Sequence, residues 1–126
     1  MTTPKLSGLH HVTFPVPNLD TATSWFEAIF GAKYLPELDH YDEHGVHFGV
    51  VLQLPGIQPF ILLRRADELP DLSEVVLSVA DKAELKRWAT HFDGHGIAHS
   101  EVRLGRAGYV MTCTMADGPA LALCAG

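Results

Sequence analysis

An internal repeat is the sequence feature that most constrains how this chain can fold. When the 126-residue sequence is compared with itself at an offset of 63 positions, identical valine, tryptophan and glycine residues coincide. The matched pairs are Val12 with Val75, Val16 with Val79, Trp25 with Trp88, and Gly31 with Gly94. A repeat of this length corresponds to one supersecondary unit that is present twice. The sequence therefore predicts two copies of the same structural unit.

The first copy begins with a strand and a helix. Apolar residues at 12, 14 and 16 alternate with other types, which is typical of a strand with two different faces. From position 22, apolar residues recur at helical spacing through 25, 26, 29 and 30, with Asn18 or Asp20 as candidate N-caps. Gly31 follows, at the position where glycine commonly ends a helix. Further strands are predicted at 32–35, 46–54 and 59–65, with a polar loop at 37–45.

The second copy repeats this order. A strand is predicted at 74–80, and Asp81 with Glu84 three residues later indicates a helix start, with Gly94 as its end. Strands are predicted at 97–102, 109–115 and 119–124. The sequence thus predicts an α+β fold in which residues 1–126 form a single domain of two tandem βαβββ modules. We place module 1 at about 8–65, the linker at 66–72 and module 2 at about 73–125.

Charge and composition exclude several classes of partner. The net charge is −6 and the pI about 5.7, so we expect no nucleic acid and no anionic membrane as partner. No apolar run approaches the length of a membrane-spanning helix, and the N-terminus lacks the pattern of a signal peptide. Two cysteines are too few for a disulfide scaffold. We therefore expect a cytoplasmic protein.

The repeated module resembles the vicinal oxygen chelate family, which includes glyoxalase I, bleomycin-resistance proteins, extradiol dioxygenases, fosfomycin-resistance enzymes and methylmalonyl-CoA epimerase. The resemblance rests on Leu9-His10-His11-Val12 with Val16-Pro17-Asn18-Leu19-Asp20, on Trp25-Phe26 with Phe30-Gly31, and on Glu43-His44-Gly45-Val46. It covers nearly the whole chain and implies a glyoxalase-like fold, a cup-shaped mixed sheet to which each module contributes half. The fold alone does not imply a particular activity, because it supports many.

The resemblance also implies four positions for ligands of a divalent metal, one in the first and one in the last strand of each module. His11 matches the first, and strand alternation independently places it on the cup face, with His10 on the opposite face. Glu74 stands at the second opening position, where the family usually has histidine. Leu62 and Ala122 stand at the two closing positions, and neither side chain can bind a metal. The metal site that the family implies is therefore degenerate.

Two interpretations of the cup remain open. His11, His47 and Glu74 would form a relocated two-histidine, one-carboxylate site for Zn, Fe, Mn or Ni if His47 also faced the cup. Alternatively, His11 hydrogen-bonds a ligand or pairs with Glu74, and this pair either is structural or transfers protons without a metal. The remaining histidines, including His40 and His44 in the polar loop and His91, His95 and His99, are expected to be solvated.

The sequence therefore supports two functional hypotheses. The first is a small-molecule-binding protein similar to the bleomycin-resistance branch, which either sequesters an organic compound or performs metal-free acid/base chemistry with His11 and Glu74. The alternative is a divalent-metal-dependent isomerase, lyase or dioxygenase with relocated ligands. In both cases we expect a homodimer, because exposed sheet edges favour pairing between chains. The candidate ligand-binding residues are His47, Phe60, Leu62, Arg64, Tyr109 and Ala122.

Overall fold

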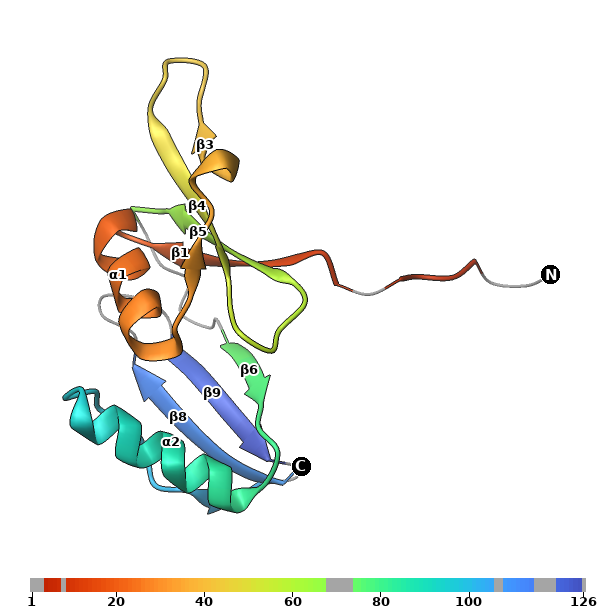
Figure 1. Ribbon diagram of the computed structural model, residues 1–126, viewed down its shortest axis with the longest axis vertical. Helices are drawn as coiled ribbons and strands as arrows, with labels where there is room; N and C mark the ends of the chain where they lie inside the picture. The colour runs from red at the N-terminus through yellow and green to blue at the C-terminus, as the bar shows by residue number, and fades with distance from the viewer. Residues whose placement is uncertain (1–3, 8, 68–73, 106–107, 115–119, 126) are drawn as a thin grey trace.

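The fold has two layers, one of β-sheet and one of helix. The computed structural model describes residues 4–7, 9–67, 74–105, 108–114 and 120–125, and at Glu74 the backbone only. Two mixed sheets form one layer, and one helix packs on the same side of each (Figure 1). Each half of the chain runs strand, helix and then further strands, as the repeat predicts. Most of the predicted linker at 66–72 lies outside the described residues.

The helix of the first half, α1 (Leu19–Phe30), has its two ends set by the sequence. The side chain of Asn18 accepts a hydrogen bond of 2.9 Å from the backbone N–H of Thr21, so Asn18 is the N-cap and Asp20 lies in the first turn. Gly31 adopts a left-handed conformation with φ of 66°, which terminates the helix as expected. Phe26 and Ile29 on the inner side of α1 are buried against the sheet.

The first sheet has the strand order β1-β5-β4-β2, and β3 also pairs with β4. Its elements are β1 (His11–Val16), β2 (Lys33–Tyr34), β3 (His40–Tyr41), β4 (His47–Gln53) and β5 (Phe60–Arg65). β1 is parallel to β5, whereas β4 is antiparallel to β5, β2 and β3. The loop predicted at 37–45 includes part of a short 3-10 helix, η1 (Pro36–Leu38), and β3.

The second half contains α2 (Lys82–Gly94) and a sheet with the order β6-β9-β8-β7. Its strands are β6 (Glu74–Ser78), β7 (Arg103–Leu104), β8 (Tyr109–Thr114) and β9 (Ala120–Ala125). Asp81 caps α2 by accepting a hydrogen bond from the backbone N–H of Glu84, as predicted. The strand predicted at 97–102 is wrong, because this segment forms only a single bridge between His99 and Cys113. No described helix is long and apolar enough to cross a membrane.

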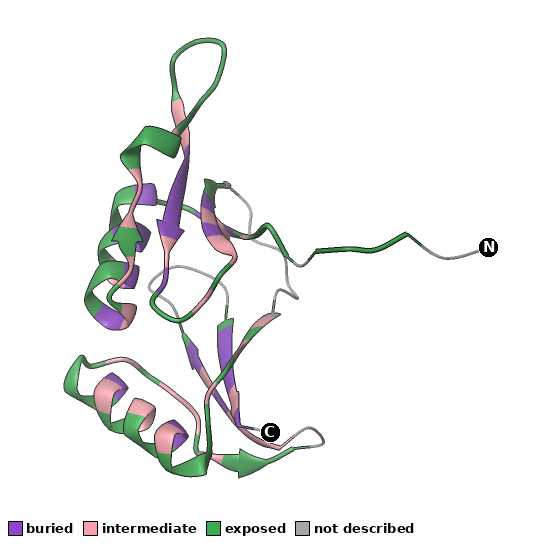
Figure 2. Ribbon diagram, turned by 45° about the vertical axis from the view of Figure 1, so that its right-hand side comes forward, coloured by how far each residue is buried: buried purple, intermediate pink, exposed green. Residues whose placement is uncertain are grey.

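One apolar core lies between the sheets and the helices and extends through both halves. The two helices also contact each other, since the ring centres of Phe30 and Trp88 lie 5.2 Å apart. His91 on α2 donates a hydrogen bond of 2.7 Å from Nε2 to the carbonyl oxygen of Ile29 near the end of α1. Each sheet thus has one face covered by its helix and one face without a helix, which we call the open face (Figure 2).

Candidate functional site

A cavity of about 300 Å³ lies on the open face of the first sheet. Apolar side chains form most of its wall, and three imidazole rings lie around it. Its lining residues are His10, His11, Leu38, His40, Val51, Phe60 and Leu62. They come from the start of β1, the η1–β3 segment, β4 and β5, so four parts of the first module build this cavity.

Strand alternation explains why these side chains share a face. His11 is aligned with Phe60 across β1 and β5, and Val51 is aligned with Leu62 across β4 and β5. The intervening residues, such as Phe14 and Ile61, point to the other side and are buried beneath α1. The structure therefore places His11, Phe60 and Leu62 on the open face, which is the face that the sequence predicts for them.

His10 also lines the cavity, which corrects the expectation that it points to the opposite face. β1 begins only at His11, so His10 precedes the strand and does not follow its alternation. The Nδ1 atoms of His10 and His11 lie 3.0 Å apart. One ring donates this hydrogen bond and the other accepts it, which places two adjacent imidazoles at the edge of the cavity.

His40 is exposed, as the sequence predicts for a loop histidine, and it also lines the cavity, which the sequence does not predict. Its Nδ1 lies 2.9 Å from the carbonyl oxygen of Leu38. Because a carbonyl oxygen can only accept, Nδ1 carries the proton. The backbone of β3 approaches β4 closely here, and a Cβ atom on Gly49 would lie 2.9 Å from the Cβ of His40. A glycine inside an apolar strand was the available signal, because such a glycine often marks a close approach of another segment.

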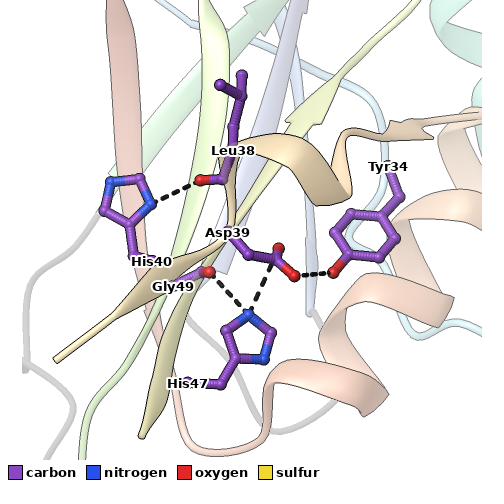
Figure 3. Close-up of polar contacts among 6 residues, drawn as sticks. All are labelled: Tyr34, Leu38, Asp39, His40, His47 and Gly49. Carbon is purple, nitrogen blue, oxygen red and sulfur yellow. Dashed lines mark hydrogen bonds and ion pairs between the residues drawn. The ribbon is translucent and has the colours of Figure 1, made fainter. Parts of the chain in front are cut away.

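His47 lies on the opposite side of β4 from His40 (Figure 3). The register between β3 and β4 shifts between His40 and Tyr41, so β4 has an extra residue, Phe48, at this point. This bulge reverses the alternation of the strand. His47 consequently lines a hollow at the start of α1, and the expectation that it faces the cup is wrong.

The buried carboxylate of Asp39 lies between His47 of β4 and Tyr34 of β2. The side chain of Asp39 is 7% exposed, and its Oδ1 lies 3.4 Å from Nε2 of His47. Its Oδ2 accepts a hydrogen bond from the hydroxyl group of Tyr34. This hydrogen bond to the carboxylate, followed by burial, raises the pKa of Tyr34 to about 12. Tyr34 is therefore a hydrogen-bond donor to Asp39 throughout the neutral pH range.

Arg64 lies on the open face, further along β5 than the cavity. It shares the alternation of Leu62, as the sequence predicts, and its side chain is exposed. The guanidinium carbon lies 5.6 Å from the ring centre of Phe48, which the bulge turns toward this face. Arg64 is thus a charged group near the cavity but is not part of its wall.

The second sheet places its three candidate residues differently. Ala122 is aligned with Val76 and Thr112 on the open face and is fully buried there. Tyr109 points to the helix side of the sheet, with Nζ of Lys82 4.4 Å from its ring centre, so the prediction that it lines the cup is wrong. Glu74 begins β6, and its side chain lies outside the described residues.

The described residues do not fit the divalent metal that the sequence resemblance implies. Of the four ligand positions that it implies, Leu62 and Ala122 offer no donor atom and His11 offers one. His47 points away from His11, as shown above. Among the described side chains, no group of three histidine, cysteine or carboxylate residues is arranged to hold a metal ion.

Comparisons with known proteins identify the fold. No protein-family model matches this chain, and no curated protein matches it. Solved structures do match. TnmS3, an antibiotic binding protein from Streptomyces sp. CB03234, superimposes with a TM-score of 0.78 at 16% identity, over 98% of each chain. A glyoxylase/bleomycin resistance protein/dioxygenase domain from Frankia sp. EAN1pec gives 0.77 at 24% identity, over 97% of this chain and 99% of that one.

The fosfomycin resistance protein FosX from Listeria monocytogenes is also similar, with a TM-score of 0.74 at 19% identity, over 97% of this chain and 94% of that one. That structure contains Mn(II) and 1S,2S-dihydroxypropylphosphonic acid. At these identities the likeness shows the fold and leaves the activity open. The neighbours thus include a protein named for binding an antibiotic and one solved with a metal, so the function of this chain depends on its own residues.

Proposed function

We propose that this chain, which has the vicinal oxygen chelate fold, is a small-molecule-binding protein whose ligand occupies the cavity on the open face of the first sheet. The observation that carries the proposal is the cavity itself, which has a volume of about 300 Å³. Its apolar wall, with a few polar groups at defined positions, is the usual composition of a site for an organic ligand. The ligand is an aromatic or otherwise largely apolar organic molecule, because Val51, Phe60 and Leu62 form the wall.

The residues at the metal-ligand positions favour direct contact between protein and ligand over binding through a metal. A side chain such as Leu62 adds apolar surface where a metal ligand would stand, and contact with such surface stabilises a bound ligand. The proposal is therefore sequestration of a compound, similar to that of the bleomycin-resistance branch. The alternative of a metal-dependent isomerase, lyase or dioxygenase with relocated ligands loses His47, which lies on the other side of β4.

A second candidate is metal-free acid/base catalysis by His11, with Glu74 as its partner. The observation that favours it is the 3.0 Å contact between the Nδ1 atoms of His10 and His11, because a hydrogen-bonded imidazole beside a cavity can transfer a proton. The variant Glu74→Gln separates catalysis from sequestration. Retained ligand affinity with lost turnover supports catalysis, and unchanged turnover contradicts a role for this carboxylate.

We further propose that the protein is a homodimer. Leu6 and Leu9, in the segment before β1, are 97% and 72% exposed, and Figure 1 shows this segment extending away from the body of the chain. Val76 on the open face of the second sheet is 52% exposed. A second copy of the chain would cover these apolar side chains. The proposed cytoplasmic location rests on the two cysteines, Cys113 and Cys124, which are both unpaired.

The binding proposal is tested with indole as an aromatic probe. Indole is titrated into isotopically labelled protein, and the NMR shifts of backbone amides report where it binds. We expect the shifts to be centred on the cavity, and the variant Leu62→Glu to abolish them because it puts a charge into the apolar wall. Leu104→Glu is the matched control, since Leu104 is 72% exposed in β7. Shifts that do not involve the cavity, or that persist in Leu62→Glu, would refute the proposal.

A further inference from the structure

The η1–β3 segment presents two side chains to the cavity and one side chain to the other side. Leu38 and His40 line the cavity, whereas Asp39 between them is buried beneath the segment. Tyr34 from β2 and His47 from β4 both reach Asp39 from that side (Figure 3). The contacts of its carboxylate therefore hold Asp39 in place, and with it the backbone of the two residues, Leu38 and His40, that face the cavity.

The two oxygens of Asp39 are held differently. Oδ2 accepts the hydrogen bond from Tyr34, whereas Oδ1 is buried and has no hydrogen bond among the described residues. Nε2 of His47 lies 3.4 Å from Oδ1 and forms its hydrogen bond, of 3.0 Å, with the carbonyl oxygen of Gly49. A buried carboxylate has a high desolvation cost, so it is stable only close to its donors. Movement of the segment away from the sheet would break these contacts.

The held segment determines which nitrogen of His40 is free. The carbonyl oxygen of Leu38 occupies Nδ1–H, and no described residue hydrogen-bonds Nε2. In the neutral ring Nε2 is then an acceptor. Around this acceptor the cavity wall is apolar, as at Val51 and Leu62, whereas His40 itself is exposed. A ligand that offers an N–H or O–H group replaces water at this nitrogen and gains the net stabilisation of one hydrogen bond.

We propose that Asp39 is a positioning residue which presents Nε2 of His40 to the cavity as the acceptor for an N–H or O–H group of an aromatic ligand. This inference rests on the proposed function and narrows its ligand to aromatic hydrogen-bond donors. Asp39 does not touch the ligand. It acts through the backbone of Leu38 and His40, and Tyr34 and His47 hold it in place from the side of the sheet that carries α1.

Indole and 1-methylindole test the ligand class, because they differ in a single N–H group. We expect the wild-type protein at pH 8 to bind indole about three- to tenfold more tightly than 1-methylindole, as one net hydrogen bond predicts. The variant His40→Phe, which keeps a ring but removes both nitrogens, is expected to lose this preference while it still binds 1-methylindole. His40→Gln, whose amide oxygen can accept, is expected to restore part of it.

The positioning role requires a readout that general stability would not change. In wild-type protein, a long-range ¹H–¹⁵N spectrum is expected to show His40 with a protonated Nδ1 and a bare Nε2. Asp39→Asn is expected to shift His40 toward a mixture of tautomers and to reduce the indole preference, with the fold retained. Asp42→Asn is the matched control, since Asp42 accepts hydrogen bonds from the backbone of His44 and Val46 in the same hairpin but does not line the cavity.

The outcomes separate this inference from the proposed function. Equal affinity of the wild-type protein for the two compounds refutes the inference and leaves cavity binding intact. An unchanged tautomer and an unchanged preference in Asp39→Asn refute the positioning role of Asp39. If neither compound binds to the wild-type protein, the proposed function fails and the ligand class fails with it. A preference that is lost in His40→Phe and Asp39→Asn and kept in Asp42→Asn supports the proposal.

Discussion

Gly49 is the position where a single methyl group is expected to disturb the cavity most. A Cβ atom added at Gly49 would lie 2.9 Å from Cβ and 3.2 Å from Cγ of His40, and 3.5 Å from Cδ1 of Leu62. Carbon atoms in ordinary contact are about 3.5–4.0 Å apart, so the variant Gly49→Ala is too close to His40 by about 0.6 Å or more. The atom it meets first is a Cβ, which cannot move without its backbone, so β3 itself must shift.

We expect Gly49→Ala to lower the free energy of unfolding by about 1–2 kcal/mol, within the usual range for an overpacked site. A double-mutant cycle identifies the cause. His40→Ala keeps the Cβ atom, so the cost of Gly49→Ala is expected to remain in that background. His40→Gly removes the Cβ atom, so there the cost is expected to fall to a few tenths of a kcal/mol. Urea unfolding of the single and double variants measures all of these values.

Two results would refute this reasoning. If Gly49→Ala costs the same in the His40→Gly background as in the wild-type background, the close approach of β3 does not explain the need for glycine. If Gly49→Ala leaves both stability and indole affinity unchanged, β3 does not lie against β4 in solution. The second result would also mean that β3 does not hold His40 at the cavity as proposed.

Three further predictions concern other parts of the molecule. Hydrogen bonds to the carbonyl oxygen of Ser100 and then to Asp93 raise the pKa of His99. The stability that charged His99 contributes should therefore be complete well below pH 6.5 and be lost as the pH rises through the folded-state pKa. His99→Gln should therefore cost more stability at pH 5.5 than at pH 9 in urea unfolding, and an equal cost at both would contradict this. Burial raises the pKa of the Cys113 thiol to about 11, so a disulfide reagent at pH 8 should modify Cys124 first and Cys113 only on unfolding. Light scattering should give twice the chain mass of 13.8 kDa, and a species of 13.8 kDa alone would exclude the dimer.

The repeat and the apolar patterns were sufficient to predict the architecture. Strand alternation in β1 placed His11 on the open face, and helical spacing with Asn18 and Gly31 gave the bounds of α1 within a residue or two. These predictions succeeded because they depend on the regular spacing of apolar residues, which recurs over several residues in each strand and helix. The prediction of a strand at 97–102 failed because β propensity does not show whether a partner strand is present. In this segment only His99 forms a bridge, with Cys113.

The site was harder to predict because two local departures from regular structure decide it. His10 precedes the strand, so alternation does not apply to it, and the extra residue Phe48 reverses the face of His47. A bulge depends on how β3 pairs with β4, and this pairing depends in turn on the absence of a side chain at Gly49. None of these positions carries a signal in hydrophobic periodicity.

The bulge at Phe48 explains how the module can bring a polar group into an apolar cavity. Without the bulge, His47 would lie on the open face and Phe48 on the side of Asp39, where an aromatic ring could offer the buried carboxylate no donor. With the bulge, His47 reaches Asp39 and Phe48 lies beside His40 and Arg64. One inserted residue thus places the imidazole of His47 next to Asp39 on one side of β4. On the other side of β4, the imidazole of His40, which is hydrogen-bonded to the carbonyl oxygen of Leu38, is the polar group that the η1–β3 segment presents to the cavity.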